Sequence, residues 1–112
     1  MLDIAVLLVY AVEVINYKAV LTEAFSAPVV RERGIGCGRI YVCVTDKEQA
    51  KEVGKAAKAL GKIFQKKAHY GLTNALYIGY DNSTGTELSR GTTVVNVLQA
   101  AGIKCYRTEE GD

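Results

Sequence analysis

The stretch from Asn74 to Asn96 constrains the fold of this chain most, because it reads as a strand, a polar loop and a helix in direct succession. Residues 74–80 fit a strand, residues 81–88 fit a glycine-containing loop with hydroxyl side chains, and the helix is predicted to begin at about Ser89. A helix N-terminus presents unpaired backbone N–H groups and the positive end of the helix dipole. The stretch therefore predicts an anion-binding corner between the strand and the helix.

Side chains suited to a nucleotide-like ligand surround this corner. Tyr80, at the strand exit, can stack on a base, and Arg90 and Thr92 fall in the first turn of the predicted helix. Asn82 follows Asp81 in the loop, and the two fit either a metal site or a turn capped by an Asx side chain. We therefore expect ligand-binding roles for Tyr80, Asn82, Arg90 and Thr92, and we assign no metal site.

A further arginine, Arg107, follows a short predicted strand at residues 103–106. If that strand lies parallel to the strand at residues 74–80 and next to it, Tyr80 and Arg107 meet at the same edge of the sheet, the usual mouth of an α/β fold. The tyrosine ring would then stack on a base while the guanidinium forks onto phosphate oxygens. Plain packing of Tyr80 and a solubilising role for Arg107 are the alternatives.

The middle of the chain alternates between strand and helix patterns. Residues 39–44 are rich in β-branched and aromatic residues and are predicted to form a strand. A helix capped by Thr45 or Asp46 is expected to run to about Gln65, because apolar residues recur there at steps of three and four. The last helix is expected to extend over residues 92–101. Alternation of this kind predicts a mixed α/β sheet with helices packed on it.

The N-terminal part is harder to assign. Both alternating sets of residues 2–15 are apolar, which allows a buried strand or a buried helix, and the abundance of Val and Ile favours a strand. After a turn at Asn16, residues 17–25 are expected to return as a second strand. The predicted fold is thus one α/β domain over residues 1–112, a mixed sheet with two main helices in which an N-terminal strand pair is followed by β-α-β-α-β. A strand that is apolar on both faces, as residues 2–15 would be, must be covered on both faces by helices or by another subunit. One chain of 112 residues has little material to spare for this, which favours a homo-oligomer.

Composition bounds the partners and the compartment. The apolar run Ile4–Val12 is far shorter than the roughly 20 residues that span a bilayer, and Asp3 stands where a secretory signal carries Lys or Arg. The three cysteines include no Cys-x-x-Cys pair, so neither a disulfide framework nor a zinc knuckle is indicated. A net charge of +2 does not by itself argue for DNA or an anionic membrane. We expect a cytoplasmic protein with no membrane partner and no specific nucleic-acid partner.

Two basic features deserve separate interpretations. A row of lysines follows one side of the expected central helix: Lys47, Lys51, Lys55, Lys58, Lys62 and Lys66. Such a row can mark a funnel for anions, but Glu48 and Glu52 pair with lysines at helical spacing, which favours a solvated face. Arg31 and Arg33 precede a glycine-rich loop at residues 34–38 that lacks the ending of a P-loop. That loop fits a connector or, alternatively, an anion contact by these arginines across a subunit boundary.

Catalytic motifs are missing from the sequence. It holds no Gly-x-Ser-x-Gly elbow and no cysteine with an evident histidine partner. His69 is the only histidine, which excludes a mechanism or a metal cluster that needs two within one chain. We expect no catalytic residue, no metal and no cofactor. The alternatives are a small enzyme acting on a nucleotide or phosphodiester with His69 as acid or base, and an interaction module.

A family resemblance covers roughly the second half of the chain. Three stretches look like small phage and prophage proteins, in particular the Thoeris anti-defence sponges that capture cyclic ADP-ribose isomers made by host immune enzymes: Lys-Ala-His-Tyr-Gly at residues 67–71, Asn-Ala-Leu-Tyr-Ile-Gly-Tyr-Asp-Asn at 74–82 and Ala-Gly-Ile-Lys-Cys-Tyr-Arg at 101–107. In that family an aromatic side chain and a C-terminal arginine hold the ligand between two subunits. The positions that match are Tyr80 and Arg107, whereas Arg90 stands where the family pattern calls for an asparagine.

The resemblance implies a function as well as a site. The protein would be a homo-oligomer that binds a nucleotide signal tightly and leaves it chemically intact, and so would not be an enzyme. Members of the family also bind cyclic oligonucleotides, which implies a second site rich in Arg and Lys.

Overall fold

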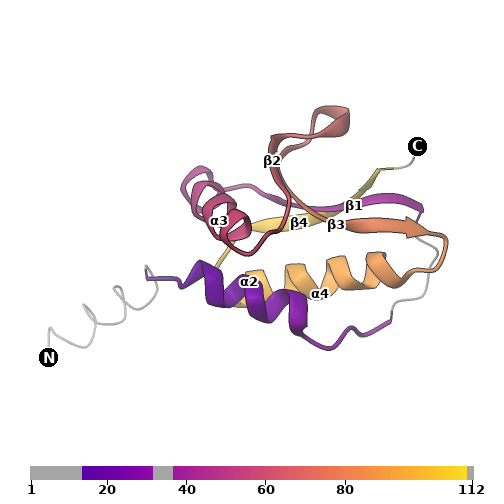
Figure 1. The fold of residues 1–112 in the computed structure, drawn as a ribbon, viewed down its shortest axis with the longest axis horizontal. Coiled ribbons are helices and arrows are strands. Elements are labelled where there is room, and N and C mark those ends of the chain that lie inside the picture. Colours follow the sequence, from indigo (N-terminus) through magenta and orange to yellow (C-terminus); the bar gives the residue numbers. More distant parts are fainter. Residues whose placement is uncertain (1–13, 32–36, 111–112) are drawn as a thin grey trace, which may run out of the picture.

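This computed structural model describes residues 14–31 and 37–110. These residues form an antiparallel sheet with helices packed on it (Figure 1). The elements in chain order are α2 (Tyr17–Ser26), β1 (Cys37–Val44), α3 (Lys47–Ala59), β2 (Phe64–Lys67), the 3₁₀ turn η1 (His69–Gly71), β3 (Thr73–Asn82), α4 (Thr86–Ala100) and β4 (Cys105–Glu110). The expected α/β class is confirmed. The strand order is β2-β3-β1-β4, and all three pairings are antiparallel, where a mixed sheet was expected.

The helices share one face of the sheet. Figure 1 shows α2 and α4 side by side along this face, α3 at one end, and the β2–β3 connection rising on the other side. The main core lies between the sheet and the helices, and Val42, Leu76, Val53, Leu21 and Leu98 contribute to it from different elements. A smaller cluster on the other face holds Tyr41, Cys43 and Ala75.

The expected strand at residues 17–25 is wrong, because this segment is helix α2. The Asn16 side chain accepts a hydrogen bond from the Ala19 N–H at 3.1 Å and so caps the helix, where the sequence pattern had assigned a turn. Leu21 and Ala24, three residues apart, are its buried positions, as helical periodicity requires. Most of the other expected N-terminal strand, residues 2–15, lies outside the described residues.

Helix α3 begins as expected and ends earlier than expected. Asp46 caps it by accepting from the Gln49 N–H at 2.9 Å. The chain leaves the helix at Leu60 and Gly61, whose φ of 71° is the left-handed conformation typical of a helix end. Phe64 therefore belongs to strand β2, and its ring packs over Gly54, where an added Cβ would lie 3.1 Å from the ring.

Helix α4 approaches the sheet closely at Gly91. A Cβ at this position would lie 2.8 Å from the Cγ2 atom of Ile40 on β1 and 3.1 Å from the Cδ atom of Arg107 on β4. Only glycine allows this approach, so Gly91 sets the distance between the helix and both strands. The helix starts at Thr86, earlier than the predicted start at Ser89.

Candidate functional site

The expected anion-binding corner exists, and the chain fills it with its own carboxylate. Asp81, at the end of β3, is fully buried. Its Oδ1 atom accepts from the backbone N–H groups of Thr84 and Gly85 at 2.9 and 3.0 Å, and its Oδ2 atom accepts from that of Leu88 at 3.0 Å. Gly85, the N-cap of α4, has no side chain to cap with, and Asp81 takes over that task from the strand.

The hydrogen bonds decide the charge state of this carboxyl group. Burial by itself raises the pKa of Asp81, but the N–H groups of Leu88, Gly85 and Thr84 and the Thr84 hydroxyl outweigh it and hold the pKa below its ordinary value. Asp81 is therefore an anion at neutral pH, seated where a ligand phosphate was expected. The sequence allowed either a metal site or a capped turn at Asp81 and Asn82, and the hydrogen bonds of Asp81 fit the capped turn.

Arg107 lies on the helix-covered face of the sheet. Its Nη1 atom donates to the Thr92 hydroxyl at 2.6 Å and to the Leu88 carbonyl at 3.5 Å, and its stem packs against Gly91. The structure thus brings together two of the expected site residues, Arg107 and Thr92. Their contact connects β4 to α4 inside the fold.

Tyr80 lies on the opposite face of the sheet from Arg107. Both neighbours of Tyr80 point toward α4, since an added Cβ at Gly79 would meet Glu87 and the Asp81 carboxylate binds the helix start. Tyr80 therefore points away from the helices, and 44% of it is exposed. The expected meeting of Tyr80 and Arg107 on adjacent parallel strands is wrong within one chain, because β1 lies between β3 and β4. Asn82, two residues on, is exposed at the end of β3.

Arg31 contacts the loop that precedes α4. Its Nη2 atom donates to the Thr84 carbonyl at 2.7 Å. The side chain therefore lies at the expected corner but binds the protein backbone there. Arg33 and most of the glycine-rich loop fall outside the described residues.

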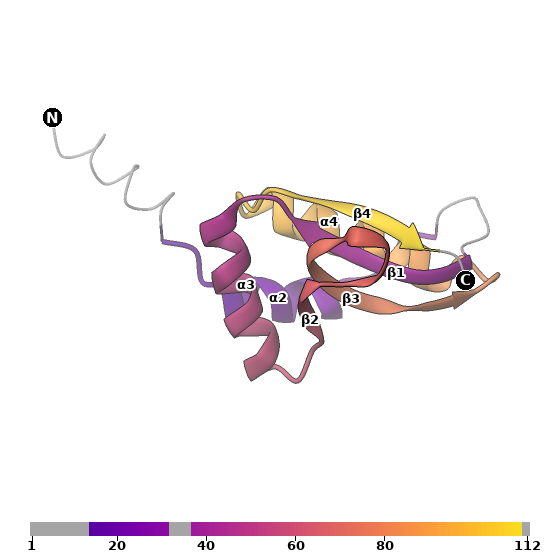
Figure 2. The same cartoon turned by 90° about the horizontal axis from the view of Figure 1, so that it is seen from above.

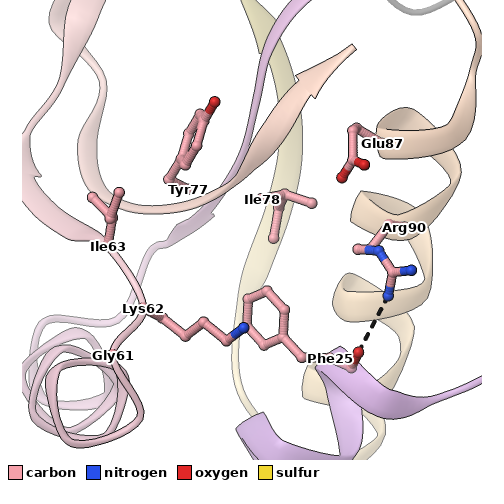
Figure 3. Close-up of a pocket in the computed structure, with 8 residues that line it drawn as sticks. All are labelled: Phe25, Gly61, Lys62, Ile63, Tyr77, Ile78, Glu87 and Arg90. Atoms are coloured by element: carbon pink, nitrogen blue, oxygen red, sulfur yellow. Dashed lines mark hydrogen bonds between the residues drawn. The ribbon is translucent and has the colours of Figure 1, made fainter.

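A cavity of about 410 Å³ opens at the edge of β3, next to the start of α4 (Figure 3). It is formed where the end of α2, the α3–β2 connection, β3 and the first turns of α4 meet. Its lining residues are Phe25, Gly61, Lys62, Ile63, Tyr77, Ile78, Glu87 and Arg90. Strand β2 begins at Phe64, which pairs with Leu76, and the Tyr77 N–H donates to the Ile63 carbonyl at 2.9 Å. Beyond that bond, no strand among the described residues covers this edge of β3.

The charged groups of the cavity come from opposite walls. The Lys62 ammonium lies 4.3 Å from the centre of the Phe25 ring, a cation–π contact that directs it across the opening. From the other wall, Arg90 donates one hydrogen bond of 3.2 Å to the Phe25 carbonyl (Figure 3). Glu87 is folded over Gly79, where an added Cβ would lie 2.6 Å from its carboxylate oxygen. The lining thus carries two cations and one carboxylate.

Of the expected site residues that the structure describes, Arg90 is the one that lines this cavity. Sequence analysis missed three lining residues: Phe25, Lys62 and Glu87. They come from three segments of the chain that only the tertiary fold brings together. Lys62 did belong to the lysine row, and that row is the only sequence signal that pointed to it. The Tyr77 ring packs edge-on against Tyr41, with ring centres 5.5 Å apart.

Other chemistry expected or excluded from the sequence lies elsewhere. His69 is exposed in the β2–β3 connection and is not among the lining residues. Within residues 14–31 and 37–110, no group of three or more His, Cys, Asp or Glu side chains is placed to hold a metal ion. Over the same residues, no helix has the length and apolar character needed to cross a bilayer. Comparison with family models, curated proteins and solved structures finds no match to this chain.

Proposed function

We propose that this protein binds and sequesters a small nucleotide-like anion in the cavity between α2, β3 and α4, without transforming it. One observation carries the proposal: Lys62 and Arg90 line the same cavity from opposite walls, with Glu87 between β3 and α4. An anion held there would be approached by a cation from each side.

The chemistry of the lining fits a phosphorylated sugar or nucleotide. An ammonium and a guanidinium are the usual partners of phosphate oxygens, and the guanidinium can offer two parallel donors. Glu87 accepts hydrogen bonds, so it suits ribose hydroxyls or a base amino group. Ile63, Ile78 and the Phe25 ring supply apolar surface beside these polar groups. A volume of about 410 Å³ falls within the range of small-molecule sites.

The sponge function implied by the phage-protein resemblance is kept in this proposal, with a different site. Cyclic ADP-ribose isomers carry two phosphates and ribose hydroxyls, the groups that Lys62, Arg90 and Glu87 suit. Tyr80 and Arg107 no longer form one intrachain pair, and ligand contact by both would need a second copy of the chain. A homo-oligomer in the cytoplasm, as expected from the sequence, remains part of the proposal.

Calorimetric titration of the protein with cyclic ADP-ribose isomers, mononucleotides and cyclic dinucleotides tests the proposal. We expect one class to bind and to be recovered unchanged, by chromatography and mass spectrometry, after heat denaturation of the protein. Lys62→Ala should weaken binding about tenfold, the effect of losing one charge-assisted hydrogen bond. The matched control is Lys58→Ala, since Lys58 is an exposed lysine of α3 that does not line the cavity.

Three results would contradict the proposal. These are the absence of heat of binding for every class, equal loss in both lysine variants, and consumption of the ligand. The last would favour the alternative of a small nucleotide-acting enzyme, and His69→Ala would then show whether the histidine takes part.

A further inference from the structure

The outer side of α3 carries lysines that do not belong to the cavity. Lys47, Lys51, Lys55 and Lys58, which we call the α3 lysines, are all exposed, and none of them lines the cavity. A helix turns by about 100° per residue, so the four fall within an arc of about 80°. The buried residues of this helix lie on its other side: Ala50, Val53, Ala56 and Ala57. The α3 lysines therefore form a row that faces away from the core, at one end of the fold (Figure 2).

Acidic side chains neutralise only part of this row. Lys55 forms an ion pair with Glu52, with 3.7 Å between its Nζ atom and the carboxylate oxygen. Among the described residues the other three α3 lysines form no ion pair, and neither does Glu48, which was expected to pair at helical spacing. Lysines three or four residues apart on a helix repel each other, and successive members of this row stand at those spacings. An anion bound along the row would relieve this repulsion.

The length of the row fits an extended anion. Lys47 and Lys58 are 11 residues apart in α3, which is about 16 Å along the helix axis. One strand of a nucleic-acid duplex carries a phosphate about every 3.4 Å along its axis, so the row spans about five phosphates of that strand. A single nucleotide would leave most of the row without a partner.

The composition of this surface does not fit the other common partners of a basic helix. The cores of protein–protein interfaces are depleted of lysine and enriched in aromatic residues. A helix that lies in a membrane surface buries its apolar side in the lipid, but the apolar side of α3 is already buried in the core of this fold. A phosphate strand requires neither feature, because ammonium groups are sufficient to bind it.

We propose that the α3 lysines bind the phosphate backbone of a nucleic-acid duplex without reading its sequence. Contacts to phosphates carry no sequence information, which agrees with the expectation of no specific nucleic-acid partner. Helix α3 contains no aromatic residue, so the row offers no ring on which an unpaired base can stack. This favours a duplex over a single strand. DNA and RNA duplexes share the same phosphate chemistry, and the experiment below distinguishes them.

Fluorescence anisotropy with labelled DNA and RNA duplexes of about 20 base pairs, from roughly 25 to 300 mM NaCl, tests the proposal. We expect at least one duplex type to bind, and two duplexes of that type with unrelated sequences to bind within about twofold of each other. The logarithm of the association constant should fall linearly with the logarithm of the salt concentration, with a slope of about −3.5 for four contacted phosphates of B-form DNA.

Charge-removing variants locate the surface. Lys51→Gln combined with Lys58→Gln should weaken duplex binding at least about tenfold at low salt and reduce the magnitude of the slope by about 2. The matched control is Lys67→Gln combined with Lys104→Gln, two exposed lysines outside α3. The control changes the net charge equally and should leave the affinity within about threefold. All four substitutions are at exposed positions, and circular dichroism confirms that both double variants are folded.

Several results would overturn the proposal. These are the absence of binding to either duplex at the lowest salt concentration, equal loss of affinity in the two double variants, and tighter binding to a single strand of oligo-dT than to the duplexes. Binding to vesicles that contain phosphatidylserine, with no binding to either duplex, would assign the row to a membrane surface and would likewise overturn it. None of these outcomes depends on a small ligand in the cavity.

Discussion

The carboxylate of Asp81 accepts a hydrogen bond of 3.0 Å from the backbone N–H of Leu88, and thereby connects the end of β3 to the first turn of α4. The same carboxylate holds the intervening loop through Thr84 and Gly85. One buried anion thus organises the strand–loop–helix unit on which the cavity wall with Glu87 and Arg90 is built.

Asp81→Asn should lower the free energy of unfolding by about 2–4 kcal/mol, because an amide NH₂ replaces one of two accepting oxygens and the buried donors lose a charged partner. Asp46→Asn is the matched control, because Asp46 also caps a helix and asparagine caps about as well as aspartate. This variant should lower the free energy of unfolding by less than about 0.5 kcal/mol. Urea denaturation of both variants measures the difference. Equal losses would contradict the role assigned to Asp81.

The stability that Asp81 provides should depend on pH in the acid range. Its pKa is lowered from 3.8 in the folded chain, so the folded state favours the ionised form, and the stabilisation is complete above the unfolded pKa. As the pH falls below 3.8 and through the lower folded pKa, this contribution is lost. The difference in unfolding free energy between the wild type and Asp81→Asn should therefore be constant at neutral pH and shrink below pH 3.8. A difference that grows on acidification would contradict the account.

Gly91→Ala tests the close approach of α4 to the sheet. Alanine in place of glycine favours a helix by about 1 kcal/mol, but the new Cβ would lie 2.8 Å from the Cγ2 atom of the buried Ile40. Overpacking of about 1–3 kcal/mol should outweigh the helical gain and lower the urea midpoint. Asn96→Ala, at an exposed position of the same helix, should instead be neutral or slightly stabilising. A stabilised Gly91→Ala variant would show that α4 can move away from β1 without loss.

Cys105 should react slowly with alkylating reagents in the folded protein. Burial raises the pKa of its thiol from 9.0 to about 11, and the thiolate is the reactive form. At pH 8 the folded protein then holds about a hundredth of the thiolate present in the unfolded chain. Iodoacetamide labelling followed by peptide mass spectrometry should show Cys105 alkylated at least about 100-fold more slowly before unfolding than after it. Similar rates in both states would contradict its burial.

The sequence predicted the elements better than their arrangement. The strands at residues 39–44 and 74–80 and the helix that begins after Asp46 are confirmed, because turn and capping residues bound them locally. Residues 17–25 form a helix instead, since Asn16 is a helix cap that the pattern also allowed as a turn. Local patterns carry no information on strand order. They could therefore not predict that β1 lies between β3 and β4, nor that Tyr80 and Arg107 are separated.

The cavity was predictable only in part for the same reason. Arg90 was expected near a ligand from its place at the start of a helix, and it does line the cavity. Phe25 and Lys62 join it through the packing of α2 and of the α3–β2 connection, which no spacing in the sequence encodes. The helix start was expected to be open to an anion, but the Asp81 carboxylate occupies it. A capped turn at Asp81 was one of the two interpretations that the sequence allowed.

Binding of a cyclic ADP-ribose isomer to Lys62→Glu and Lys58→Glu, measured side by side by calorimetry, tests the central claim most directly. Reversing the charge at the cavity opening should weaken binding at least about tenfold, whereas the same reversal on the outer face of α3 should leave it within about twofold. Equal affinities for the two variants would show that the cavity lined by Lys62 and Arg90 is not the binding site.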